Sequence, residues 1–434
     1  MRFIFKKIIE IYLRLITKKI IKKYKPQIIA ISGSLGKTST KNAAFQVIKS
    51  KFKKVQMSPG GLNTELGVPL SVMGVDREVE NNFSFWFWVI KRALKVYSGK
   101  IKTPPVLILE MGVDRPMDMD KLIKMTKPDI AILTNIRSSH LKNFKNKSLL
   151  VKEKLKLIQN VDKSGTVIIN GDDEQLKRYS QKLRCKVITY GLQKDNLIKA
   201  RDITQKCSIE EIKKGNWGLS YKLNYRKNII PINLKKILGK SQVYASLAAV
   251  SLGIAMDLSL LDIADSLKNY QSPKGRLNII TGLKNSVIID DSYNASDPLS
   301  VVNGLKILRK TKALKKIAVI SDMLELGKFK KKAHLQAAKK ALETANVIFT
   351  IGERSKIIHN YCRKNSKIKS HIIKHFENKK DLIKDTAEVL NKNCAVYVKG
   401  SQGMRMEKVV KALMKEPAKA RQFLVRQSSE WLKK

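Results

Sequence analysis

A short apolar run at residues 28–31 is followed at once by the sequence GSLGKTST at residues 33–40. A glycine-bearing loop between a buried strand and a helix presents consecutive backbone N–H groups that can bind a phosphate. The usual P-loop has four residues between its two glycines, whereas Gly33 and Gly36 enclose only Ser34 and Leu35. The stretch therefore predicts a strand, a shortened phosphate-binding loop and a helix.

Short apolar runs alternate with helical patterns along the rest of the chain, which predicts α/β architecture with a mainly parallel sheet. The first series of expected strands lies at residues 28–31, 106–109, 130–134, 167–169 and 187–190. Residues 216–238 predict a hairpin or small antiparallel patch, and residues 243–254 a helix. After the turn sequence SPKG, a second series has expected strands at 287–289, 316–320, 347–351 and 395–398.

These series divide the chain into four parts. We expect a basic amphipathic helix at 1–25, a P-loop-type central ATPase domain at 26–272, a C-terminal Rossmann-like α/β domain at 273–416 and a helical tail at 417–434. Lysine and arginine interrupt every apolar run of the first segment, so it predicts neither a transmembrane helix nor a signal peptide. Two roles stay open for it: contact with an anionic membrane surface, or packing on the protein or a partner.

The composition is strongly basic, with 87 Lys and Arg against 36 Asp and Glu and a formal charge of +51. Lysine is spread along the whole chain, and no stripe of alternating basic and aromatic residues occurs, so no specific nucleic-acid partner is expected. The four cysteines have no paired spacing, which predicts neither a zinc cluster nor a disulfide framework. A reducing, cytoplasmic location fits this pattern.

Polar side chains follow three of the expected strands. Lys37 and Thr38 can neutralise a phosphate and hold Mg²⁺. Glu110 ends a buried strand, where a carboxylate needs a cation or hydrogen-bond partner. Asn135 and His140 follow the next strand in ILTNIRSSHL. Because ligands bind at the carboxyl ends of parallel strands, these residues predict one nucleotide and magnesium site.

Together these features resemble the Mur ligase family, whose ATP loop has this short GxxGKT form. Six further stretches are similar to the branch of that family that adds D-alanyl-D-alanine to UDP-N-acetylmuramoyl-tripeptide. They are GLNTELGVPLSV (61–72), LEMGVDRPMDMDKL (109–122), KGRLNII (274–280), IIDDSYNASDPLSV (288–301), ISDMLELG (320–327) and VKGSQGMRME (398–407). The resemblance extends over residues 26–415.

The resemblance implies an ATP- and Mg²⁺-dependent amide ligase. ATP would phosphorylate a peptide carboxylate, and an amine would attack the acyl phosphate. Thr38 and Glu110 would hold one Mg²⁺, His140 would help to hold a second, and Lys154 is the best-aligned candidate for a carbamylated lysine, with an ordinary surface lysine as the alternative. The implied catalytic residues are Lys37, His140, Lys154 and Arg276.

The resemblance also implies two sets of binding residues. Those expected to contact the nucleotide are Gly33, Ser34, Gly36, Lys37, Thr38, Ser39, Asn135, Arg276, Asp290, Asp291, Tyr293 and Asn294. Those expected to contact the incoming amine are Lys399, Ser401 and Arg405.

The phosphate loop begins at residue 33, so the N-terminal domain that grips the UDP-sugar in this branch is not expected here. Either UDP is held by other surfaces, including the basic segment 86–100, or the acceptor is another carboxylate, such as a lipid-linked muropeptide. A third reading, of another class, is a non-catalytic nucleotide-binding or nucleic-acid-associated scaffold. We expect a cytoplasmic monomer, with residues 1–25 as the candidate contact with the inner face of the plasma membrane.

Overall fold

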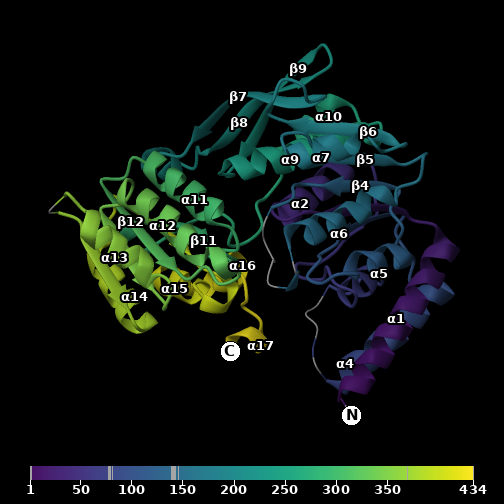
Figure 1. The fold of residues 1–434 in the computed structure, drawn as a ribbon, viewed down its shortest axis with the longest axis horizontal. Helices are drawn as coiled ribbons and strands as arrows, with labels where there is room; N and C mark the ends of the chain where they lie inside the picture. Colours follow the sequence, from purple (N-terminus) through teal and green to yellow (C-terminus); the bar gives the residue numbers. More distant parts are fainter. Residues whose placement is uncertain are drawn as a thin grey trace.

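The computed structural model of the chain describes residues 2–76, 80, 82–137, 143–144, 146–368 and 370–433, and the side chains of these residues other than 2–6, 147 and 328. Two α/β units, each with its own sheet, lie side by side (Figure 1). The predicted fold class is therefore confirmed.

The first unit is built on a nine-stranded sheet in the order β2-β3-β1-β4-β5-β6-β7-β8-β9. Its strands are β1 (Gln27–Ser32), β2 (Val55–Met57), β3 (Val106–Glu110), β4 (Ile130–Leu133), β5 (Thr166–Asn170), β6 (Lys186–Gly191), β7 (Ile198–Lys206), β8 (Gly218–Tyr225) and β9 (Asn228–Lys235). Every neighbouring pair from β2 through β1 to β7 in this order is parallel, whereas β8 pairs antiparallel with both β7 and β9. The five predicted strands and the hairpin are all present.

Helices cover both faces of this sheet. They are α1 (Arg2–Tyr24), α2 (Lys37–Ile48), α3 (Gly67–Val72), α4 (Phe83–Ser98), α5 (Asp118–Met125), α6 (Lys147–Gln159), α7 (Glu174–Ser180), α9 (Lys240–Ala255) and α10 (Leu260–Leu267). The short helix α8 (Ile209–Lys213) packs instead on the core of the second unit through Ile212. Successive residues of a strand point to opposite faces, so Ile28 packs with α1, α4 and α5 whereas Ile29 packs with α2, α9 and α10. Burial on both faces explains the uninterrupted apolar runs of the sequence.

The second unit has a six-stranded sheet in the order β10-β11-β15-β12-β13-β14, parallel except for β10. Its strands are β10 (Asn278–Thr281), β11 (Val287–Asp291), β12 (Lys315–Ser321), β13 (Val347–Ile351), β14 (Ile372–Phe376) and β15 (Cys394–Lys399). Its helices are α11 (Pro298–Lys310), α12 (Lys330–Leu342), α13 (Lys356–Asn365), α14 (Lys379–Val389), α15 (Glu407–Leu413), α16 (Ala420–Phe423) and α17 (Ser429–Leu432). The sequence did not indicate β10 and β14.

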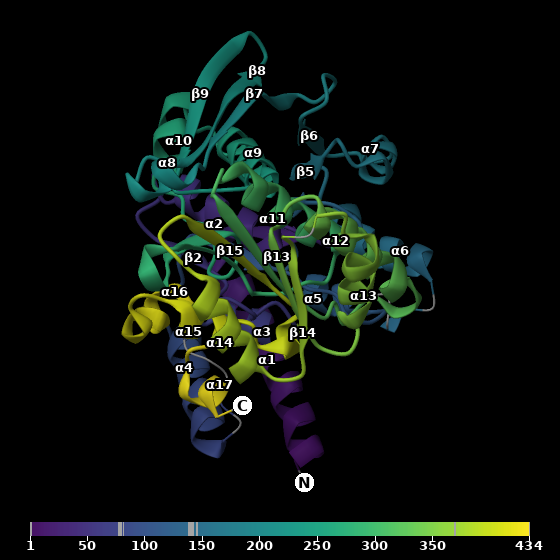
Figure 2. The ribbon, with the colours of Figure 1, turned by 90° about the vertical axis from the view of Figure 1, so that its left-hand side faces the viewer.

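Helix α1 packs on the first unit through its apolar face. Ile9, Leu13, Ile16 and Ile20 are buried in the same core cluster as residues of α3, α4 and α5. The segment 1–25 was expected either to contact a membrane or to pack on the protein or a partner. The structure shows that this helix packs on the protein. Helices α1 and α4 project from the body in both views, with the N-terminus at the free end (Figures 1 and 2).

The predicted helical tail consists of several short elements. It forms a 3-10 turn at Pro417–Lys419 and the short helices α16 and α17. Arg426, between them, has a φ of 57°, a left-handed conformation that interrupts a right-handed helix. The contacts of this residue, described below, account for the interruption.

Candidate functional site

The predicted phosphate loop connects β1 to α2 at the carboxyl end of the parallel sheet. Gly36 is the residue before α2, with a φ of 83°, and Gly33 has a φ of 142°. A Cβ atom at Gly33 would lie 2.0 Å from the Thr134 Oγ1 atom of the neighbouring strand end. Both glycines are therefore required by the conformation of the loop, and Gly33 also by close packing. The start of α2 directs its N–H groups toward the loop.

The segment after β4 fixes the shape of this loop. The Asn135 side chain accepts a hydrogen bond from the Leu35 N–H and donates one to the Leu35 carbonyl, each at 3.0 Å. The backbone carbonyl of Asn135 accepts a hydrogen bond from the Ser34 N–H at 2.9 Å, and the Ser34 hydroxyl accepts one from the Arg137 N–H at 2.8 Å. Asn135 thus holds the loop backbone directly. Its contact with a nucleotide stays a prediction.

Lys37, the first residue of α2, folds back over the loop. Its Nζ atom donates to the Gly33 carbonyl at 2.8 Å and lies 3.4 Å from the Ser34 carbonyl. Burial lowers the pKa of Lys37, and the negative charge of Glu110 opposes this effect. The ammonium group therefore lies directly over the loop whose amides could bind a phosphate.

Glu110 ends β3 beside the loop and is only 3% exposed. Its carboxylate lies 3.4 Å from the Lys41 Nζ atom and accepts hydrogen bonds from Asn63 at 3.2 Å and from the Thr38 hydroxyl at 3.4 Å. Burial alone would raise the pKa of Glu110, but the charges of Lys41 and Lys37 outweigh it and hold the pKa below its ordinary value. An ionised carboxylate thus lies within hydrogen-bond distance of the hydroxyl that follows the loop lysine.

Lys154 reaches the other side of the loop from α6. It is 1% exposed, and its Nζ atom donates to the Gly33 carbonyl at 3.3 Å. Burial, followed by repulsion from Lys37, lowers the pKa of Lys154 to about 7. The amine is therefore about half neutral at neutral pH, unlike an exposed lysine. This burial argues against the alternative of an ordinary surface lysine.

His140, predicted as a catalytic residue and a metal ligand, lies outside the described residues. Within the described ranges, no three His, Cys, Asp or Glu side chains gather as a metal-binding group. Thr38 and Glu110 supply oxygen atoms, which Mg²⁺ prefers, and Mg²⁺ commonly takes only one or two protein ligands beside phosphate and water. The pair therefore fits Mg²⁺ held together with a nucleotide.

Arg276 approaches the site from the second unit, just after the turn at Gly275. Its guanidinium lies 4.3 Å from the centre of the Tyr293 ring, and its Nε atom is buried without a hydrogen-bond partner among the described residues. Its charge also contributes to the pKa values of Lys37 and Glu110, although burial is the largest cause in each. Arg276 is therefore close enough to the phosphate loop to act on it electrostatically.

The two aspartates at the end of β11 are buried, and one of them is paired. The Asp291 carboxylate accepts from the Lys399 Nζ atom at 2.7 Å and from the Tyr397 hydroxyl at 3.1 Å. Asp290 accepts from the Ser292 N–H at 3.0 Å, and burial raises the pKa of Asp290 to about 6. Lys399, expected to contact the incoming amine, thus forms an ion pair inside the second unit.

Three of the quoted motifs meet at the carboxyl edge of the second sheet. The Asn294 side chain accepts from the Gln402 N–H at 3.2 Å. The Ser401 hydroxyl accepts from the Leu324 N–H at 2.8 Å, and the Ser401 N–H donates to the Asp322 carbonyl at 3.0 Å. The stretches around 290, 322 and 401 therefore form one connected surface, as the strand-end argument predicts.

The tail contributes residues that the sequence did not indicate. Arg426 donates to Glu407 at 3.1 Å and to the Tyr293 carbonyl at 2.5 Å. Glu407, which is fully buried, also accepts from Arg405 at 2.5 Å, and Arg405 lies over the Trp431 ring. The tail is thus attached to the loop that carries Tyr293, the ring against which Arg276 lies.

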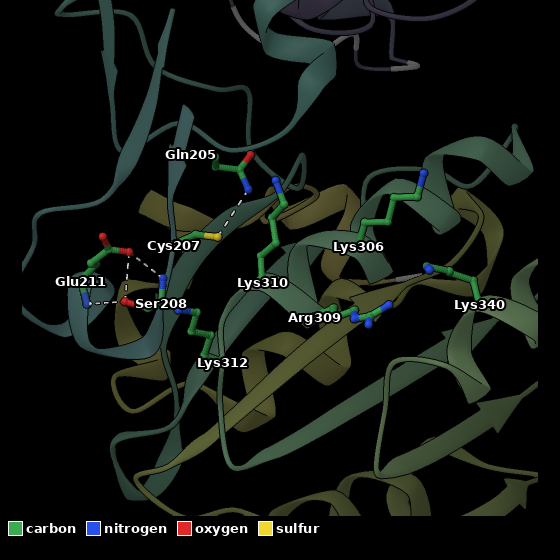
Figure 3. A pocket seen from close by; sticks show the side chains of 9 residues that line it. All are labelled: Gln205, Cys207, Ser208, Glu211, Lys306, Arg309, Lys310, Lys312 and Lys340. Carbon is green, nitrogen blue, oxygen red and sulfur yellow. Dashed lines mark hydrogen bonds between the residues drawn. The ribbon is translucent and has the colours of Figure 1, made fainter. Parts of the chain in front are cut away.

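A cavity of about 780 Å³ lies away from these residues, where α8 faces α11 and α12 (Figure 3). It is lined by Gln205, Cys207, Ser208, Glu211, Lys306, Arg309, Lys310, Lys312 and Lys340. Glu211 accepts hydrogen bonds from the Ser208 N–H and hydroxyl, which cap α8. No predicted site residue within the described ranges lines this cavity, so it is separate from the candidate site.

Comparison with known proteins identifies relatives that match most of this chain. A relative from Bacillus subtilis, named UDP-N-acetylmuramoyl-tripeptide–D-alanyl-D-alanine ligase, is 27% identical over 394 residues, which cover 90% of this chain and 76% of the relative. A relative of the same name from Buchnera aphidicola is 29% identical over 397 residues, which cover 91% of this chain and 76% of the relative.

The crystal structure of MurF ligase from Thermotoga maritima in complex with ADP has a similar fold, with a TM-score of 0.75 and 22% identity over 94% of this chain and 84% of that one. The Mur ligase middle domain matches residues 31–253, and the Mur ligase, glutamate ligase domain matches residues 275–402. Since the first match alone spans just over half of the chain and the second spans most of the other sheet, this chain belongs to the Mur ligase family.

Proposed function

We propose that the protein is an ATP- and Mg²⁺-dependent ligase that adds D-alanyl-D-alanine to UDP-N-acetylmuramoyl-tripeptide. The observation that carries the proposal is the arrangement of Lys37, Lys154 and Glu110 around the loop at Gly33. It provides two amines and one ionised carboxylate at a phosphate loop, as transfer of a phosphoryl group to a carboxylate requires. The names of the relatives described above support the choice of substrates.

In this proposal the loop and Lys37 hold the phosphates of ATP. Amides at the start of α2 donate to phosphate oxygens, and Lys37 moves from the Gly33 carbonyl to the transferred phosphate. Arg276 adds a positive charge from the second unit. The acceptor carboxylate attacks the γ-phosphorus and ADP leaves, which produces an acyl phosphate. The neutral amine of D-alanyl-D-alanine then attacks the carbonyl carbon and loses one proton to solvent. The bond between that carbon and the phosphate oxygen breaks, so phosphate leaves as the amide forms.

Thr38 and Glu110 are the proposed ligands of Mg²⁺. The Glu110 Oε2 atom is buried and accepts no hydrogen bond from any described residue, although it lies 3.4 Å from Lys41. An ionised oxygen in this position can bind a cation. When bound, Mg²⁺ would offset the negative charge of the phosphate oxygens. His140 is proposed as a ligand of a second Mg²⁺.

Lys154 is the proposed site of carbamylation. A lysine must be neutral to attack CO₂, and burial gives Lys154 a pKa of about 7. The Nζ–C bond would form with loss of one proton from the nitrogen, leaving a carbamate that could bind the second Mg²⁺. This change would replace a buried amine with an anion beside Lys37.

The residues of the second unit are proposed to complete the site. Tyr293 and Asn294 would contact the nucleotide, with Asp290 and Asp291 shaping their loop from inside the sheet. Contact of the incoming amine with Lys399, Ser401 and Arg405 stays a prediction. In this structure Lys399 and Arg405 form ion pairs with Asp291 and Glu407, so a direct contact would require these pairs to open.

The test is a phosphate-release and mass-spectrometry assay. The purified protein with ATP, Mg²⁺, UDP-N-acetylmuramoyl-tripeptide and D-alanyl-D-alanine should release phosphate and form the pentapeptide product. Lys37→Ala should abolish both, whereas Lys49→Ala, at the far end of α2, should not. Absence of product with this acceptor and turnover with a lipid-linked muropeptide would replace the proposed acceptor.

That second acceptor is favoured by one specific observation, the exposed apolar and basic side chains on the projecting helices α1 and α4. A ligase held at a membrane would meet a lipid-linked acceptor directly. The same assay decides between the two acceptors, because the nucleotide-linked and lipid-linked substrates are offered separately.

A further inference from the structure

Helices α1 and α4 form a projecting pair. The Lys23 Nζ atom and the Tyr24 hydroxyl, at the end of α1, both donate to the Tyr97 carbonyl near the end of α4, at 2.7 and 2.9 Å. The two helices therefore run in the same direction, with their beginnings at the same end. This end points away from both sheets (Figures 1 and 2).

Exposed apolar side chains concentrate on this pair. Seven of the 20 large apolar side chains that are exposed in the described chain lie on α1 and α4, which contain less than a tenth of its residues. We define them as the α1–α4 surface: Ile8, Ile11, Leu15, Phe83, Phe87, Leu94 and Tyr97. A scattered exposed leucine is ordinary, but such a concentration indicates an interaction surface.

On α1 the exposed residues form a stripe that is apolar near the start of the helix and basic toward its end. Ile8, Ile11 and Leu15, at 58%, 42% and 53% exposure, follow helical spacing on one face. The same face continues with the exposed Lys18 and Lys22 toward the body of the protein. Since Ile9 and Leu13 on the opposite face are buried in the core, the stripe is not needed for packing within the chain.

On α4 the exposed residues combine aromatic rings with cations. Phe83 and Phe87 stack at 6.4 Å, and the Lys91 Nζ atom lies 4.4 Å from the centre of the Phe87 ring. The helix contains Lys91, Arg92 and Lys95 and no acidic residue, and α1 contains eight Lys and Arg residues and one acidic residue, Glu10. Aromatic rings mixed with cations are typical of segments that lie at lipid headgroups.

We propose that the α1–α4 surface docks on a bilayer that contains anionic phospholipids. The apolar stripe would enter the headgroup region at the projecting end, and the lysines closer to the body would contact lipid phosphates. A second copy of this chain is a poor occupant, because it would bring the same positive charge to the interface. In Figure 1 the free end of α1 and the C-terminal helix α17 lie on the same side of the molecule, so the tail would face the bilayer as well.

The test is co-sedimentation of the full chain with vesicles of phosphatidylcholine alone or with 30% phosphatidylglycerol, in about 0.15 M salt. We expect binding to the mixed vesicles only. Ile8→Ser with Phe87→Ser, and separately Lys18→Gln with Lys22→Gln, should each lower the partition coefficient by about tenfold or more. Circular dichroism verifies the fold of each variant, and size-exclusion chromatography with light scattering gives its mass.

Matched controls separate this surface from the general basicity of the chain. Leu261→Ser with Leu314→Ser removes two apolar side chains that are more exposed than Ile8 and Phe87, and Lys331→Gln with Lys332→Gln removes two charges from α12. Both controls should bind like the wild type. The proposal would be overturned if the control variants lost as much vesicle binding as the α1 and α4 variants, or if the wild type bound both vesicle types equally. It would also be overturned if the wild type were a dimer that only the α1 and α4 variants disrupt. Vesicle binding does not depend on ligase activity, so this result is independent of the proposed function.

Discussion

Replacing Lys154 by methionine should make the protein more stable at neutral pH while reducing ligation. An unfolded chain keeps the Lys154 proton up to a pKa of about 10.5, whereas the folded protein, with a pKa of about 7, loses it. Folding at pH 7 must therefore either bury a charge or release a proton. This cost is fully present below pH 7 and disappears as the pH rises toward 10.5.

The size of the effect follows from these two pKa values. At about 1.4 kcal/mol per pH unit, the cost is about 4 kcal/mol at pH 7 and about 1 kcal/mol at pH 9.5. Methionine has a similar volume and carries no charge, but it loses the hydrogen bond to the Gly33 carbonyl, worth about 1 kcal/mol. The variant should therefore gain about 3 kcal/mol at pH 7 and almost nothing at pH 9.5.

The assay is thermal unfolding of wild type and variant at both pH values, in bicarbonate-free buffer so that Lys154 stays unmodified. A gain of about 3 kcal/mol corresponds to a rise in Tm of about 6–12 °C for a domain of this size. Lys152→Met, at an exposed position of the same helix, is the control and should change little at either pH. A Lys154→Met variant that is no more stable at pH 7, or equally stabilised at both pH values, would refute the burial of this amine beside the loop.

Three further predictions concern the loop, the tail and the metal. Gly33→Ala places a Cβ atom against Thr134 at a φ of 142°, so ATP binding measured by calorimetry should weaken more than tenfold; an unchanged Kd would contradict the loop geometry. Arg426→Ala leaves the buried Glu407 with one arginine, and denaturant unfolding should show a loss of about 2–3 kcal/mol, with part of it restored by Arg426→Lys. Glu110→Gln should raise the Mg²⁺ concentration required for half-maximal phosphate release, and an unaltered Mg²⁺ titration would remove Glu110 from the metal site.

The sequence predicted the parts of the site that are local. A strand, a glycine loop and a helix follow one another along the chain, and Glu110 ends an apolar run, so their chemistry is visible without a structure. The position of Lys41 near the site could also have been predicted, because residues four apart lie on the same face of a helix and Lys41 follows Lys37 by four.

Other parts depend on pairing between distant segments, which no local pattern indicates. The Asn135 side chain accepts a hydrogen bond from the Leu35 N–H, 100 residues earlier in the chain. Arg426 donates one to the Tyr293 carbonyl, 133 residues earlier. The tail has helical composition, yet these bonds stabilise a left-handed residue at 426 and divide it into short helices. Helical propensity is a small term that a buried ion pair and hydrogen bonds outweigh.

The central claim is that the phosphate loop serves the transfer of a phosphoryl group from ATP to a carboxylate. The most direct measurement uses an acceptor whose terminal carboxylate is labelled with ¹⁸O, followed by mass spectrometry of the released phosphate. The account predicts one ¹⁸O atom in each phosphate, because the oxygen that joins the carbonyl carbon to phosphorus leaves with phosphate when the amine attacks. Unlabelled phosphate, released together with the amide product, would contradict the acyl phosphate and with it the role assigned to this site.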